Sequence, residues 1–151
     1  MVNLTIDFKL DPALKLEKKI LHQRSGKLLI DVEGGLEIRI DHSCFFREPS
    51  LALLELGVSL KEWRMHGPKG TSNFYHYTME HDEREGPILA FIETSKDKWI
   101  LFSIWQKFKP QESIPTDGLL NAVDQYLAEL EKLLIKRFNI RYSDFIRTRK
   151  F

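Results

Sequence analysis

The side chains that could carry out chemistry are scattered along this chain and lack the spacings of known metal-binding motifs. No His-x-x-x-His pair is present, and a single cysteine cannot form Cys-x-x-Cys, so the two arrangements that place zinc ligands on one face are missing. His76 and His81 flank an acidic turn, where a metal is conceivable. We interpret all five histidines as surface residues and expect no metal and no cofactor: His22, His42, His66, His76 and His81.

Cys44 lies two positions after His42, and a cysteine near a histidine suggests thiol catalysis. It also precedes Phe45 and Phe46, and a free cysteine beside two aromatic residues usually behaves as a small buried hydrophobic group. The chain has no Gly-x-Ser-x-Gly motif, no glycine-rich phosphate loop before a helix and no dinucleotide fingerprint. We therefore expect a protein that is not an enzyme, with a small enzyme using Cys44 and His42 as the alternative.

One segment is strongly acidic. Residues 80–85 hold four carboxylates and one arginine, and they lie between two expected strands. A loop of this kind can attract and dock a basic partner by charge complementarity, whereas the plainer interpretation is a solvated turn. The candidate charge contacts are Glu80, Asp82, Glu83 and Glu85.

Aromatic residues near the expected sheet are candidate interface anchors, because large aromatic side chains on an exposed face contribute strongly to binding. Trp99 fits the core better than Trp105 does, since Trp105 is followed by polar residues where its strand should reach solvent. Tyr75 and Tyr77 lie near them. We choose Tyr77 and Trp105 as the possible anchors.

The carboxyl terminus is basic. Residues 136–151 carry a net charge of +5, so residues 1–135 carry −4. Four aromatic residues interleave with these cations, a pattern that could contact a nucleic-acid backbone or stack on bases. The same segment could dock on the core with its arginines in water, and we expect this docked arrangement.

Length and composition indicate one domain. The chain has 151 residues, 42% of them hydrophobic, and a net charge of +1 that favours no particular class of partner. One cysteine fits a reducing compartment, and the amino terminus lacks the pattern of a signal peptide. No apolar run approaches the roughly 18 residues that span a bilayer. We therefore expect a cytoplasmic protein without a membrane partner.

Residue periodicity predicts the first half of the fold. Alternation over residues 2–8 predicts a strand, and Asp11-Pro12 predicts the start of a short helix that stops at Ser25-Gly26. Alternation on both sides of Gly34-Gly35 predicts a hairpin with a tight turn at the two glycines. Glu48-Pro49-Ser50 predicts the opening of a second helix, which runs through Gly57 to Trp63.

Three strands and a long helix are predicted for the second half. The strands cover residues 73–79, 88–93 and 99–105, and the last two are apolar on both faces, as central strands covered on both sides are. Thr116 is the expected N-cap of the final helix. The order β-α-β-β-α-β-β-β-α predicts a single α+β domain over residues 1–151, with a mainly antiparallel sheet of about five to six strands and about three helices.

Several short motifs resemble small bacterial immunity proteins. They are Phe46-x-Glu48-Pro49, Trp63, Phe74-x-His76-Tyr77, Pro87-Ile88-Leu89-x-Phe91 and Trp99-x-Leu101-x-Ser103-Ile104-Trp105-Gln106. The chain is most similar to the immunity family paired with cell-wall-associated repeat toxins of Gram-positive bacteria.

This resemblance implies a cytoplasmic, non-catalytic protein that binds the toxic carboxy-terminal domain of its cognate toxin, commonly a nuclease, and neutralises it by stoichiometric binding. It supplies no catalytic residues, and the family's binding residues vary with the partner. An acidic loop on a mildly acidic body suits a basic nuclease domain. The basic carboxyl terminus departs from this pattern, and it supports the rival hypothesis of a nucleic-acid-binding module.

Overall fold

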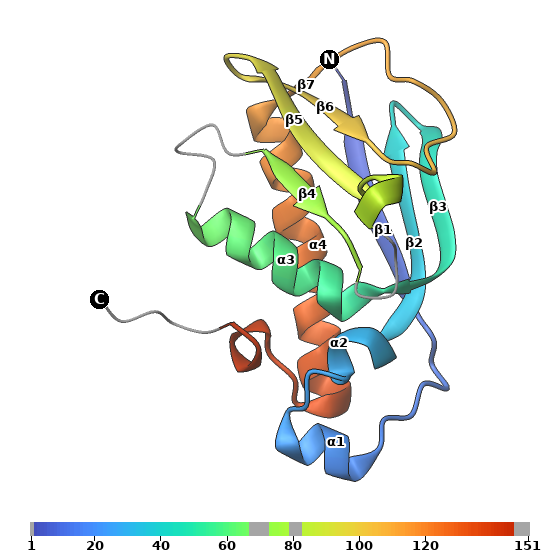
Figure 1. Cartoon of the computed structure of the whole chain (residues 1–151), viewed down its shortest axis with the longest axis vertical. Helices are drawn as coiled ribbons and strands as arrows, with labels where there is room; N and C mark the ends of the chain where they lie inside the picture. Colours follow the sequence, from blue (N-terminus) through green and yellow to red (C-terminus); the bar gives the residue numbers. More distant parts are fainter. Residues whose placement is uncertain (1, 67–72, 79–82, 147–151) are drawn as a thin grey trace.

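A computed structural model describes residues 2–66, 73–78 and 83–146 of the chain (Figure 1). The elements in chain order are β1 (Leu4–Leu10), α1 (Lys18–Gln23), α2 (Leu28–Asp31), β2 (Glu33–Ile40), β3 (Ser43–Ala52), α3 (Leu53–His66), β4 (Phe74–His76), the 3-10 helix η2 (Glu83–Glu85), β5 (Leu89–Ser95), β6 (Lys98–Phe102), β7 (Ile114–Pro115), α4 (Thr116–Phe138) and the 3-10 helix η3 (Tyr142–Asp144).

The predicted α+β class and the antiparallel pairing are confirmed, but the strands form two sheets instead of one. Three strands pair in the order β1-β2-β3, and four pair in the order β4-β5-β6-β7. Helix α4 packs against β1 of the first sheet and against β6 and β7 of the second, so it joins the two sheets (Figure 1). Among the described residues, no helix has the length and apolar composition needed to cross a bilayer.

The hairpin predicted at Gly34-Gly35 is wrong. Residues 28–31 form helix α2, both glycines lie inside β2, and the turn comes later, at Asp41 and His42. These two residues have φ of 49° and 70°, the positive values that a tight primed turn requires. Gly34 serves another purpose, because a Cβ there would collide with the Lys9 carbonyl of the paired strand.

The starts of the first two predicted helices are also wrong. Asp11 accepts the Ala13 N–H at 2.9 Å in a local turn, and α1 begins only at Lys18. Arg137 donates to the carbonyls of Asp11, Pro12 and Leu14. These oxygens therefore accept hydrogen bonds from a side chain and not from the backbone N–H groups of a helix. Residues 48–50 belong to β3, where pairing with β2 extends the strand to Ala52 before α3 begins.

An aromatic cluster forms the core between α3 and the four-stranded sheet. The ring of Trp63 lies 5.8 Å from Phe74, 5.6 Å from Phe91 and 5.9 Å from Trp99, measured between centroids. These spacings fall in the range at which tilted and edge-to-face aromatic pairs attract one another. Trp99 is fully buried, and its indole N–H donates to Thr116 Oγ1 at 2.9 Å.

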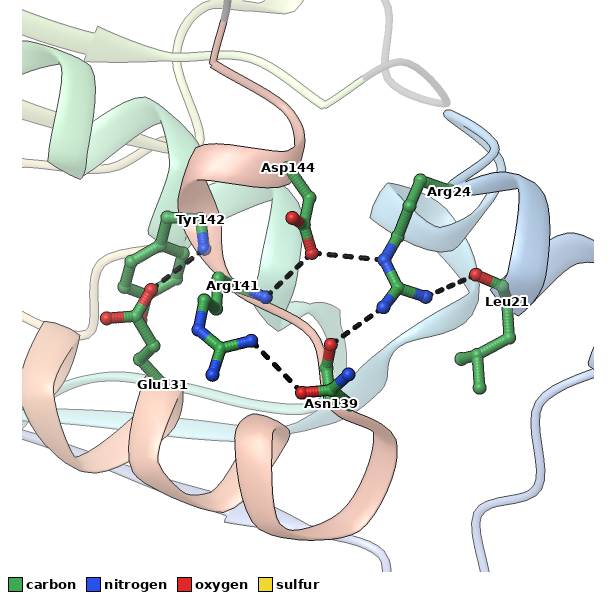
Figure 2. A network of polar contacts seen from close by, with 7 residues as sticks. All are labelled: Leu21, Arg24, Glu131, Asn139, Arg141, Tyr142 and Asp144. Atoms are coloured by element: carbon green, nitrogen blue, oxygen red, sulfur yellow. Dashed lines mark hydrogen bonds and ion pairs between the residues drawn. The ribbon is translucent and has the colours of Figure 1, made fainter.

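The described part of the carboxyl terminus packs on the core. Ile140 and Tyr142 are buried, and the Tyr142 hydroxyl donates to the Leu127 carbonyl at 2.8 Å. Figure 2 shows Arg24 bridging α1 to this segment, with bonds to Asp144 Oδ2 at 3.1 Å and to the Asn139 carbonyl at 2.8 Å. The cations at positions 147, 149 and 150 lie outside the described residues.

Candidate partner-binding surface

Trp105 occupies a turn that connects the two sheets. Its backbone N–H donates to Ser103 Oγ at 3.0 Å, and two residues later the Lys107 N–H donates to the Phe45 carbonyl of β3 at 2.8 Å. The Trp105 ring stacks on Phe46 with 6.4 Å between centroids and an interplanar angle of 30°. With 41% of its surface exposed, Trp105 is fixed on one face and accessible on another.

Beside Trp105 lies a cleft of about 230 Å³ that is lined by three carboxylates. Glu33 comes from the start of β2, Glu48 from β3 and Glu55 from the first turn of α3. We call it the acidic cleft, and none of its described lining residues is basic: Ile30, Glu33, Glu48, Ser50, Leu51, Ala52, Glu55, Thr78, Ile88 and Trp105. Ser50 Oγ donates to Glu33 Oε2 at 2.9 Å and orients this carboxylate.

A buried histidine lies behind the acidic cleft. His76 is only 2% exposed, which corrects its interpretation as a surface residue, and its Nε2 is 4.0 Å from Glu55 Oε1. Burial lowers the pKa of His76 to about 4, because the surrounding apolar side chains cannot solvate an imidazolium. The neutral ring lies parallel to Phe74 at 6.3 Å and forms part of the core. His76 was predicted as a surface residue together with the other histidines, because none of them has the spacing of a metal ligand.

The acidic loop of residues 80–85 is flanked in sequence by two residues of the acidic cleft. Thr78 comes before the loop and Ile88 after it, and both line the cleft. Glu80 and Asp82 lie outside the described residues. Glu83 begins the 3-10 helix η2, and Glu85 at its end is exposed. Gly86 follows with φ of 106°, a conformation that glycine adopts without the steric cost of a side chain.

Tyr77 is 37% exposed and lies one residue before Thr78 of the acidic cleft. Both proposed anchors therefore reach solvent at or next to the cleft. The three lining carboxylates were not among the sequence candidates, because positions 33, 48 and 55 form no motif. Their convergence depends on the register in which Gly34 pairs with Leu51, and no local pattern encodes this pairing.

A second exposed surface lies on the outer face of the four-stranded sheet. Tyr75 pairs with Ala90, and Ala90 pairs with Phe102, so the two aromatic side chains lie in one cross-strand row. Tyr75 is 51% exposed and Phe102 is 39% exposed. β5 and β6 are central in their sheet as predicted, but they are not covered on both faces, and Phe102 was missed for that reason.

The two residues of the alternative catalytic pair lie at the turn between β2 and β3 and at the start of β3. Cys44 is half-buried in β3, and its thiol donates to the Phe46 carbonyl at 3.7 Å. His42 lies in the preceding turn and is exposed. Within the part of the chain that the structure describes, no group of three or more histidine, cysteine or acidic residues is placed to hold a metal ion.

Comparison with known proteins gives one match. The DUF7878 family, a domain of unknown function, matches residues 6–136. The chain belongs to this family. The DUF7878 match runs from β1 almost to the end of α4 and includes every residue that lines the acidic cleft. No curated protein and no solved structure matches the chain.

Proposed function

We propose that the protein is a cytoplasmic, non-catalytic immunity protein. It binds the toxic carboxy-terminal domain of a cognate bacterial toxin and neutralises it by stoichiometric protein–protein binding. The observation that carries the proposal is the acidic cleft, where three carboxylates lie beside a tryptophan that is exposed and held in place. A toxin domain that acts on nucleic acid needs a basic surface, and an acidic inhibitor surface complements it.

The acidic cleft and the acidic loop would contribute to binding in different ways. A cleft of about 230 Å³ accommodates a single side chain, and a lysine or arginine would reach Glu33 and Glu48 with its charged end. Its aliphatic part would lie against the Trp105 ring, as the stems of long charged side chains do on apolar surfaces. The acidic loop would add long-range attraction that raises the rate of association.

A reconstituted pair tests the proposal. The partner is first identified by crosslinking and affinity capture from the source organism, and its carboxy-terminal domain is then expressed with and without this chain. We expect co-expression to restore growth, and titration calorimetry to give a ratio of one to one. A captured protein whose domain is not toxic, or a toxic domain that this chain does not neutralise, would exclude the immunity function.

Charge-reversal variants locate the surface. We expect Glu33→Lys with Glu48→Lys to weaken binding at least 100-fold and to slow association, since a basic partner is then repelled. The matched control is Glu62→Lys with Glu112→Lys, which changes the charge equally at two exposed positions outside the cleft. Equal losses in both double variants would mean that overall charge, and not the acidic cleft, controls binding.

A further inference from the structure

Positive charge is concentrated in two segments that the proposed toxin-binding surface does not use. Residues 15–27 contain five lysines and arginines against one glutamate, and residues 132–144 contain four against one aspartate. These segments carry +4 and +3 in a chain whose net charge is +1. They meet in space, because α1 lies beside the carboxyl end of α4 at the bottom of Figure 1.

A groove of about 610 Å³ separates α1 from the end of α4. We call it the basic groove, and it is lined by Lys18, Lys19, Leu21, His22, Arg24, Phe138 and Asn139. The groove is shallow and widely open to solvent, a shape that suits an extended strand better than an enclosed small molecule. The groove differs from a patch of surface lysines in two ways. Its walls come from two elements, and the wall formed by α4 includes an aromatic side chain, Phe138.

The arginines and the lysines of this region have different roles. Arg24 contacts Asp144, Leu21 and Asn139, and Arg137 donates to three backbone carbonyls, so both guanidinium groups stabilise the fold (Figure 2). Lys18 and Lys19 are exposed, and no ion pair within the described residues involves either one. The lysines are therefore available to an anionic ligand.

We propose that the basic groove binds single-stranded nucleic acid, with Lys18 and Lys19 on the phosphate backbone and Phe138 against a base. Proteins that bind single strands combine a positive groove with an aromatic side chain. Here the aromatic side chain is Phe138, which is half-buried and has the Arg137 guanidinium 4.9 Å from its ring centroid, so a base would meet the remaining accessible part of the ring. The large apolar side chains exposed among the described residues are Met65, Tyr75, Tyr77, Phe102 and Trp105, and none lines the groove. Leu21 and Phe138, its two large apolar side chains, are half-buried, so the groove presents no large exposed apolar group of the kind that inserts into a bilayer.

This site is separate from the acidic cleft and does not depend on the proposed toxin partner. It also places the candidate nucleic-acid site in a different part of the chain from the one that the sequence indicated. Sequence alone directed that hypothesis to residues 136–151, whereas the groove takes most of its free charge from α1. Arg137 and Ile140 of the carboxy-terminal segment are instead held by contacts with the rest of the fold.

Fluorescence anisotropy with labelled 12-nucleotide DNA and RNA strands tests the groove. We expect Lys18→Glu with Lys19→Glu to weaken binding at least tenfold and to flatten the slope of log affinity against log salt by about 1.4, since each phosphate contact contributes about 0.7. The matched control is Lys96→Glu with Lys98→Glu, which makes the same charge change in the exposed β5–β6 turn and should weaken binding less than threefold.

Phe138→Leu separates base stacking from backbone attraction. This variant should bind the oligonucleotide several-fold more weakly and bind inorganic polyphosphate as the native protein does, because only the oligonucleotide has bases to stack. Three results would overturn the proposal: no oligonucleotide binding by the native protein at 50 µM, equal losses in the two lysine double variants, or binding to phosphatidylserine vesicles in place of oligonucleotides. Circular dichroism checks that each variant is folded.

Discussion

The ring of Tyr142 lies against the backbone of Gly57, so close that a Cβ on Gly57 would be 2.7 Å from Tyr142 Cε1. The tyrosine cannot easily move away, since its hydroxyl donates to the Leu127 carbonyl at 2.8 Å and its backbone N–H donates to Glu131 at 2.8 Å. This contact explains a glycine inside α3, where helix propensity alone disfavours it. It also fixes the carboxy-terminal segment on the helix pair.

Gly57→Ala should therefore destabilise the protein by about 1–3 kcal/mol, as overpacked core substitutions do, despite the gain in helix propensity. Urea denaturation measures this change. The matched control is Gly118→Ala in α4, where the nearest atom to an added Cβ is 3.6 Å away. There the same substitution should stabilise by about 0.5–1 kcal/mol. A stabilised Gly57→Ala variant would show that Tyr142 yields without cost.

Stability should depend on pH through His76. Its pKa is lowered to about 4 in the folded protein from 6.5, so the unfolded chain binds the proton more tightly. The contribution of His76 to the free energy of unfolding is therefore complete above pH 6.5 and is lost as the pH falls toward 4. The loss amounts to about 3 kcal/mol.

His76→Phe should remove this part of the pH dependence. Denaturation between pH 4 and pH 7 would show a smaller loss of stability for the variant than for the native protein, with the carboxylates contributing to both. His22→Phe is the control, because His22 is exposed and its replacement should leave the curve unchanged. Parallel curves for the native protein and His76→Phe would mean that folding does not lower the pKa of His76.

Arg24 should stabilise the contact between α1 and the carboxy-terminal segment. Arg24→Ala removes its bonds to Asp144 and to two backbone carbonyls, and we expect a loss of about 1 kcal/mol because the pair is partly exposed (Figure 2). Hydrogen exchange of α1 should accelerate while that of β5 stays unchanged. Arg24→Lys should not restore protection, since one ammonium cannot reproduce the planar fork of contacts.

Thr116 should stabilise the fold by accepting the hydrogen bond of the Trp99 indole. Thr116→Val removes the acceptor and leaves a buried N–H without its partner, which costs about 1–3 kcal/mol. Thr116→Ser keeps a hydroxyl at the same place and should be close to native in thermal denaturation. If the valine variant were as stable as the serine variant, the 2.9 Å bond would contribute nothing to folding.

Only part of the candidate site could be predicted. Trp105 was found because it is followed by polar residues where its strand should reach solvent, and Tyr77 was found as an aromatic residue near it in the expected sheet; both are exposed. The acidic loop was visible as a local run of charge. Glu33, Glu48 and Glu55 could not be found in this way, because they come from three different elements and converge only when the sheet registers are set.

The sequence by itself determined the elements whose residue pattern is local and long. Alternation was sufficient for β1, two short apolar runs joined by a polar link were sufficient for the β5–β6 hairpin, and the 3.6-residue period was sufficient for α4. The tertiary structure decided the rest. Gly34 lies in a strand where the neighbouring Lys9 backbone leaves no room for a Cβ, His76 is buried because α3 covers it, and the Asp11 carbonyl, in a local turn, also accepts a bond from Arg137. In each case the deciding partner is distant in sequence, so no local pattern could reveal it.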